Sequence, residues 1–159
     1  MKVLIVSDTH GSLENLKKVI EIEKPDRVIH CGDSHNQEDR IAECVRVPLD
    51  IVGGNCDGGF MLPNELVTTA MGKRIFVTHG HLYGVYSGIQ TLAREAKARE
   101  CEIVFYGHTH VPDIEYYGGL RIVCPGSLKE PRQPSRIPTY AIMEEREDGE
   151  INIKIVEIK

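Results

Sequence analysis

Five short apolar runs in this chain each end in a small polar cluster, and this pattern constrains the fold more than any other feature. Such runs are typical of strands that are buried on both faces, because they leave no polar side. The polar segments that follow them span residues 7–10, 30–33, 53–57, 78–81 and 107–110. Ligands of α/β proteins bind at the carboxyl ends of the strands. The pattern therefore predicts an α/β sheet whose polar residues meet at one edge.

The segments between these strands are typical of helices and hairpins. We expect one helix between Ser12, as its N-cap, and Pro25, and a second helix over residues 86–99. Hairpin turns are expected at residues 72–73, 118–119 and 148–149. Residues 125–138 contain four prolines and are predicted to form a long surface loop. We interpret residues 1–159 as one α/β (α+β) domain with mixed sheets.

Charge and cysteine content exclude several classes of protein. The net charge of −5 argues against stable nucleic-acid binding and against an anionic membrane surface, which both favour a basic surplus. The sequence has no apolar stretch of the ~18 residues that a membrane span needs, and no signal peptide. The five cysteines are scattered and odd in number, which suits a reduced interior. We therefore expect a cytoplasmic protein without a disulfide framework.

Histidines and carboxylates dominate the polar clusters, and their number indicates metal binding. Neutral imidazole and carboxylate bind Zn²⁺, Mn²⁺, Fe²⁺ or Ni²⁺. The candidate ligands are Asp8, His10, Asp33, Asn55, His79, His108 and His110. A catalytic ion needs about three protein ligands, so seven are too many for one ion, whereas two ions that share one carboxylate use all of them. The sequence contains no phosphate-binding P-loop, no dinucleotide fingerprint and no serine nucleophile elbow.

The order of these motifs resembles the calcineurin-like metallophosphoesterase superfamily. The series D-x-H, G-D, G-N-x-D, H and G-H-x-H occurs here at residues 8–10, 32–33, 54–57, 79 and 107–110. The chain is most similar to the small bacterial and archaeal phosphodiesterases of the YfcE type, through its SDTHG, THGH and PGS-x-x-x-PR segments. The resemblance implies a four-layer α-β-β-α sandwich of two mixed β-sheets flanked by helices.

The resemblance also implies a binuclear site with assigned ligands. The first ion would bind Asp8, His10, Asp33 and His110. The second ion would bind Asp33, Asn55, His79 and His108, so that Asp33 bridges the two ions. Two divalent transition-metal ions are expected per chain, with Mn²⁺ or Ni²⁺ favoured and Zn²⁺ or Fe²⁺ as alternatives.

The expected activity is hydrolysis of a small phosphoester, with phosphodiesters as the leading class. A hydroxide that bridges the two ions would attack phosphorus in line. Asp33, Asn55 and His81 are the candidate catalytic residues. Many superfamily members carry a histidine as general acid where this chain has Cys56. His81 is the preferred substitute, and Cys56, Asp57 and metal-bound water are the alternatives.

A non-catalytic scaffold for protein–protein interaction on the same fold is the alternative function. The two hypotheses differ in ligand integrity, and all seven ligand positions are filled in this chain. Both are compatible with a homo-oligomer. Lys129, Arg132 and Arg136 in the proline-rich loop either contact a phosphate or are ordinary surface charges.

Overall fold

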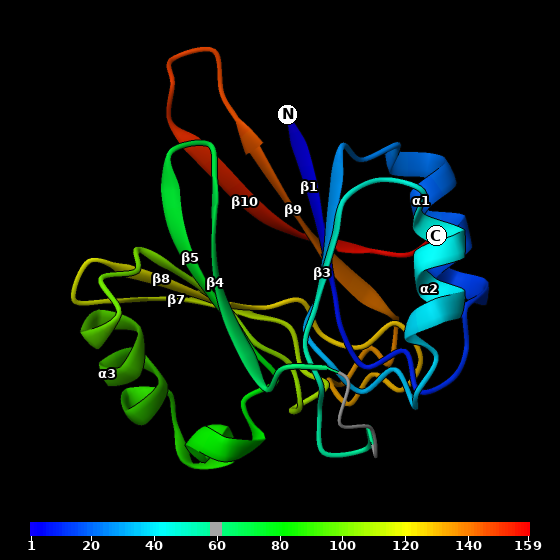
Figure 1. Ribbon diagram of the computed structural model, residues 1–159, viewed down its shortest axis with the longest axis horizontal. Helices are drawn as coiled ribbons and strands as arrows, with labels where there is room; N and C mark the ends of the chain where they lie inside the picture. Colours follow the sequence, from blue (N-terminus) through cyan, green and yellow to red (C-terminus); the bar gives the residue numbers. More distant parts are fainter. Residues whose placement is uncertain (58–61) are drawn as a thin grey trace.

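Two five-stranded mixed sheets form the centre of the computed structural model, which describes residues 1–57 and 62–159 (Figure 1). The first sheet has the order β10-β9-β1-β2-β3. Its strands are β1 Lys2–Val6, β2 Arg27–His30, β3 Leu49–Ile51, β9 Thr139–Glu145 and β10 Ile151–Glu157. The second sheet has the order β4-β5-β6-β8-β7. Its strands are β4 Glu65–Ala70, β5 Lys73–Thr78, β6 Ile103–Phe105, β7 Asp113–Tyr117 and β8 Leu120–Cys124.

Three helices cover the outer faces of the two sheets and complete the four layers. They are α1 Glu14–Glu23, α2 Glu38–Val45 and α3 Gln90–Ala98. Figure 1 shows α1 and α2 on one side of the pair of sheets and α3 on the other. The expected α-β-β-α sandwich of two mixed sheets is confirmed.

Strand β1 shows why the layers form. Its side chains alternate: Val3 and Ile5 pack into the core between the sheets, whereas Leu4 and Val6 pack against α1 and α2. All four are fully buried, as predicted for a strand with no polar face. Each such aliphatic side chain contributes roughly 1.5–3 kcal/mol when it leaves water.

Parallel pairing brings the predicted polar clusters to one edge. β1 pairs in parallel with β2, and β5 pairs in parallel with β6. The segments that follow these four strands therefore leave the sheets in matching directions. The three predicted hairpins are also confirmed, since β4–β5, β7–β8 and β9–β10 are antiparallel neighbours.

Two predicted helix starts are wrong. Leu13, not Ser12, occupies the N-cap of α1, because the Ser12 N–H closes a turn onto the Thr9 carbonyl. The predicted helix over residues 86–99 is divided: a 3₁₀ turn, Val85–Ser87, ends at Gly88, whose φ of 126° is closed to other residues, and α3 begins at Gln90. The sequence analysis also did not predict α2.

The proline-rich segment is only partly a surface loop. Residues 125–128 are buried, whereas residues 129–138 are mostly exposed. Ser127 explains the difference: its hydroxyl donates to the Asp8 carbonyl and accepts the N–H groups of Lys129 and Glu130. The segment is thus attached to the end of β1. All five cysteines are free, and within the described residues no helix is long and apolar enough to cross a membrane.

Candidate metal centre

Six predicted ligands lie together where four strands end. Asp8 and His10 follow β1, Asp33 follows β2, His79 follows β5 directly, and His108 and His110 follow β6. Their ligand atoms fall into two groups, and within each group these atoms lie within 4.8 Å of one another. Asp33 belongs to both groups, so the structure places one carboxylate between two sets of ligands.

The first ligand group contains Asp8, His10, Asp33 and His110. His110 Nε2 lies 3.1 Å from Asp8 Oδ1 and 3.1 Å from His10 Nε2. His10 Nε2 lies 3.5 Å from Asp8 Oδ1 and 3.9 Å from Asp33 Oδ2. Two ring nitrogens and two carboxylate oxygens therefore converge on one small volume.

The second ligand group contains Asp33, His79 and His108. His79 Nε2 lies 3.1 Å from Asp33 Oδ2, and the rings of His79 and His108 are 5.1 Å apart between centroids. Asn55 is the fourth ligand predicted for this group, and it lies on an exposed turn. The adjacent Cys56 N–H donates to Asp33 Oδ1 over 2.8 Å, which ties that turn to the shared carboxylate.

Backbone carbonyls fix the orientation of two histidines. His79 Nδ1 donates to the Cys31 carbonyl over 2.8 Å, and His110 Nδ1 donates to the Glu130 carbonyl over 2.6 Å. Because Nδ1 carries the proton in each neutral ring, Nε2 presents a lone pair to the centre. Metal-binding histidines are commonly held by such an outer hydrogen bond.

Two buried polar atoms in the centre have no hydrogen-bond partner among the residues that the structure describes. They are Asp8 Oδ1 and His79 Nε2, which lie 3.7 Å apart. Each residue is fully buried, so an unsatisfied acceptor there costs about 1–3 kcal/mol. Ions held by the two ligand groups would satisfy both atoms, since Asp8 belongs to the first group and His79 to the second. The imidazole and carboxylate donors therefore fit a divalent transition metal.

The backbone around the ligands is strained. The ligand residues with a left-handed φ, between 44° and 73°, are Asp8, His10, Asp33, His108 and His110. Such a conformation costs roughly 1–3 kcal/mol per non-glycine residue and is concentrated at functional sites. Two glycines allow the close packing, because a Cβ on Gly54 would clash with Asp33 Oδ1 and a Cβ on Gly107 would clash with Ser7 Oγ.

The two carboxyl groups of the centre, Asp8 and Asp33, have lowered pKa values, which favours their charged form. Burial opposes the charge of Asp8, but the contacts with His10 and His110 outweigh it and hold the pKa of Asp8 well below its usual range. Burial likewise opposes the charge of Asp33, and the His79 contact lowers its pKa overall. His30 is different: burial lowers its pKa to about 4, so this ring stays neutral. It accepts the Gly32 N–H and contacts Thr9 Oγ1, which is a structural role.

His81 lies beside the second ligand group, in the 3₁₀ turn His81–Tyr83. Its ring centroid is 5.5 Å from that of His79 and 6.1 Å from that of His108. Within the described part of the chain, its buried Nδ1 has no hydrogen-bond partner. Burial, and then the neighbouring His79, lower its pKa. His81 is thus free to contact a molecule bound at the centre.

Two residues support this centre in a way that the sequence analysis did not predict. His35 Nε2 lies 2.6 Å from His10 Nδ1, so His35 orients a ligand of the first group. Asp57 accepts the N–H groups of Asp33, Gly54 and His35 and holds the ligand loops together. These bonds occupy both of its carboxylate oxygens, so Asp57 holds the ligand loops in position, and the alternative that it donates a proton stays a prediction.

A family comparison identifies this arrangement. The family model described as the calcineurin-like phosphoesterase superfamily domain matches residues 1–148. The chain belongs to that superfamily. Members of this phosphoesterase superfamily use divalent metal ions, and the two ligand groups are where this chain would hold them. The family predicted from the ordered motifs is confirmed.

Relatives and solved structures agree with this assignment. A probable metallophosphoesterase, YsnB from Bacillus subtilis, is 35% identical over 145 residues, covering 90% of this chain and 83% of the relative. The phosphodiesterase YfcE from Escherichia coli is 29% identical, covering 83% of this chain and 82% of the relative. A crystal structure of a predicted phosphoesterase from Streptococcus pneumoniae has a TM-score of 0.83 and 29% identity, covering 98% and 88% of the two chains.

The same fold also occurs in a protein that is not named as a phosphoesterase. Vps29 from Entamoeba histolytica, solved in complex with Zn²⁺, has a TM-score of 0.77 and 20% identity, covering 99% of each chain. At this identity the likeness concerns the fold alone.

Proposed function

We propose that this calcineurin-like phosphoesterase is a phosphodiesterase with a binuclear metal centre, and that residues 1–159 act as one domain. The observation that carries the proposal is the pair of ligand groups that share Asp33. The first group would hold one ion, and the second group, with Asn55 added, would hold the other. When bound, two divalent ions would supply the attacking hydroxide and neutralise charge on the phosphoryl oxygens.

The chain's own residues would position and protonate the substrate. The His81 ring lies beside the second ligand group, and its Nδ1 has no hydrogen-bond partner among the described residues, which supports its assignment as the donor of a proton to the leaving alkoxide. Asn55 lies on the turn that Asp57 anchors, next to the shared carboxylate, and would bind both the second ion and a phosphoryl oxygen.

Arg132 is a cation of the proline-rich loop that is bonded to residues at and beside the centre. Its backbone N–H donates to the His110 carbonyl, and its Nη1 donates to the Tyr86 hydroxyl over 2.6 Å. The Tyr86 ring in turn lies 4.7 Å from the His108 ring between centroids. We assign Arg132 to phosphate binding, because a guanidinium in this position complements the negative charge of a phosphodiester.

Hydrolysis of bis(p-nitrophenyl) phosphate by metal-free protein, to which Mn²⁺, Ni²⁺, Zn²⁺ or Fe²⁺ is added singly, tests the proposal. We expect turnover with Mn²⁺ or Ni²⁺ and none after chelation. The matched control is Asp33→Asn, which keeps an oxygen for the Cys56 N–H but removes the shared charge. Absence of turnover with every ion would favour the scaffold alternative, whose support is the fold shared with Vps29.

A further inference from the structure

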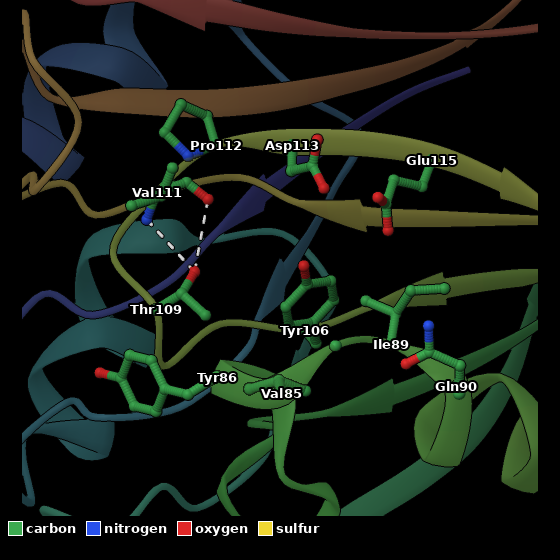
Figure 2. Close-up of a pocket in the computed structure, with 11 residues that line it drawn as sticks. Val85, Tyr86, Ile89, Gln90, Tyr106, Thr109, Val111, Pro112, Asp113 and Glu115 are labelled. Atoms are coloured by element: carbon green, nitrogen blue, oxygen red, sulfur yellow. Dashed lines mark hydrogen bonds between the residues drawn. The ribbon is translucent and has the colours of Figure 1, made fainter.

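A pocket of about 360 Å³ lies beside the metal centre, between the start of α3 and the start of β7 (Figure 2). Two residues of its wall also border the centre. Thr109 stands between the ligands His108 and His110 in sequence, and the Tyr86 ring packs against the His108 ring. The pocket therefore begins where the second ligand group ends.

Tyr106 gives the pocket an unsatisfied hydrogen-bond donor. The residue is only 4% exposed, and its hydroxyl borders the pocket without a hydrogen bond to any other described residue. Figure 2 shows its ring directed across the pocket, with the hydroxyl on the side of Asp113. The ring is thus held in the protein interior while its hydroxyl opens into the pocket, where it can donate a hydrogen bond to a ligand atom.

Two carboxylates face the same pocket. Asp113 and Glu115 are the first and third residues of β7 and therefore lie on one face of that strand. Neither takes part in an ion pair with any other described residue. Gln90 adds an amide from the start of α3, and the remaining wall is largely apolar. The negative charges oppose a phosphate here and favour groups that donate hydrogen bonds.

We infer that this pocket binds a neutral, hydroxyl-bearing ester group of the phosphodiester substrate, of the kind that a nucleoside presents through its sugar. The inference rests on the proposed phosphodiesterase function and specifies its substrate class. A sugar hydroxyl has one donor hydrogen and also accepts, so it can donate to one carboxylate of β7 and accept from the Tyr106 hydroxyl. The exposed Tyr86 ring at the entrance offers an aromatic face to the sugar or the base.

Two diesters with the same leaving group test the inference. Thymidine 5′-(p-nitrophenyl phosphate) carries the neutral hydroxylated group, and methyl p-nitrophenyl phosphate does not. We expect the wild-type protein with Mn²⁺ to prefer the thymidine diester in kcat/KM at least tenfold. Tyr106→Phe removes one hydrogen bond and is expected to lower this preference about three- to tenfold. Glu115→Gln, on the exposed side of β7, is a second variant should Tyr106→Phe not fold.

Tyr116→Phe is the matched control, because Tyr116 lies on the same strand but is 76% exposed, and it should leave the preference unchanged. Equal kcat/KM for the two diesters in the wild type, or an unchanged preference in both pocket variants, would overturn the inference and leave the phosphodiesterase proposal standing. Hydrolysis of neither diester would overturn that proposal instead. Calorimetric titration with thymidine would then test the pocket separately. Binding that Tyr106→Phe weakens would support the inferred pocket, whereas no binding, or equal binding by the two proteins, would refute it.

Discussion

The two ligand groups share Asp33 but differ in how firmly their other members are held. In the first group, His110 is fixed by the Glu130 carbonyl and His10 by His35, and Asp8 is fully buried. In the second group, only His79 is fixed in this way. The His108 ring is half-buried and, among the described residues, makes no hydrogen bond but packs against Tyr86.

This difference indicates that the two ligand groups would differ in how tightly they bind an ion and in whether they face the substrate. A preorganised set of ligands loses little entropy when an ion binds, so the first group should bind its ion more tightly. The second group, completed by the exposed Asn55, is open to solvent and borders His81 and the pocket. It should therefore exchange its ion more readily and face the substrate.

Asp33→Asn should have the largest effect, because it breaks both groups at once. Losing the shared charge removes several kcal/mol of metal-dependent stabilisation, so activity should fall on the order of 10³-fold or more. Elemental analysis should find clearly fewer than two ions per chain. His108→Ala is the comparison variant: it should lose the second ion and keep the first. If Asp33→Asn retained two ions and near-normal turnover, Asp33 would not be the bridge.

His81→Ala should impair one class of substrate, because His81 lies on the side of the second group. A well-placed acid contributes roughly 10²- to 10⁴-fold when the leaving group is a poor one. We expect kcat for an alkyl diester to fall by at least about 10²-fold, while an aryl diester, whose phenolate scarcely needs a proton, loses much less. Parallel kinetics on the two substrates measure this. Equal losses would leave His81 at most a phosphate contact.

Metal binding should also stabilise the fold, and the two groups should differ in this respect. An ion that binds only the native state adds about 2.7 kcal/mol at a hundredfold excess over its Kd. Calorimetry should therefore show a clear rise in Tm with Mn²⁺ in the parent protein. The rise should be lost in Asp8→Ala, which breaks the first group, and largely retained in His79→Ala and His108→Ala, which leave the first group intact. An unchanged Tm in the parent protein at saturating Mn²⁺ would contradict a native metal site.

The sequence was sufficient to predict the edge at which the ligands meet, because that edge follows from strand pairing. Val3–Val6 has no polar face, so it must be a buried strand, and the carboxyl end of such a strand lies beside those of its parallel neighbours. The convergence of Asp8 and Asp33 therefore needed no knowledge of loop conformation, whereas His79 reaches them from the second sheet. The YfcE-type family followed from the order of the motifs.

The supporting residues could not be predicted, since their roles depend on how loops fold onto one another. The partners of Asp57 are the N–H groups of residues 33, 35, 36 and 54, and no spacing in the sequence reveals that meeting. His35 is two residues beyond Asp33, which by itself is a weak signal. Its contact with His10 depends on the conformation of the loop between them and the strand. Helix α2 has eight residues, of which only Ile41 and Val45 are buried, too few for a clear helical period.

Cys56→Ser should have the smallest effect. It tests whether a residue beside the first ligand group donates the proton to the leaving group. Cys56 lies where many superfamily members have the histidine that acts as general acid. Its thiol lies in a cluster with His10 and His35. Burial, and then the Asp33 carboxylate, raise the pKa of this thiol, but the side chain is exposed and contacts Asn55. The hydrogen bond that matters, from the Cys56 backbone N–H to Asp33, survives the substitution.

We therefore expect kcat/KM of Cys56→Ser to stay within about threefold of the parent value on aryl and alkyl diesters alike. A large loss confined to alkyl diesters would move the proton donor from His81 to Cys56, and with it the leaving group from the second ligand group to the first.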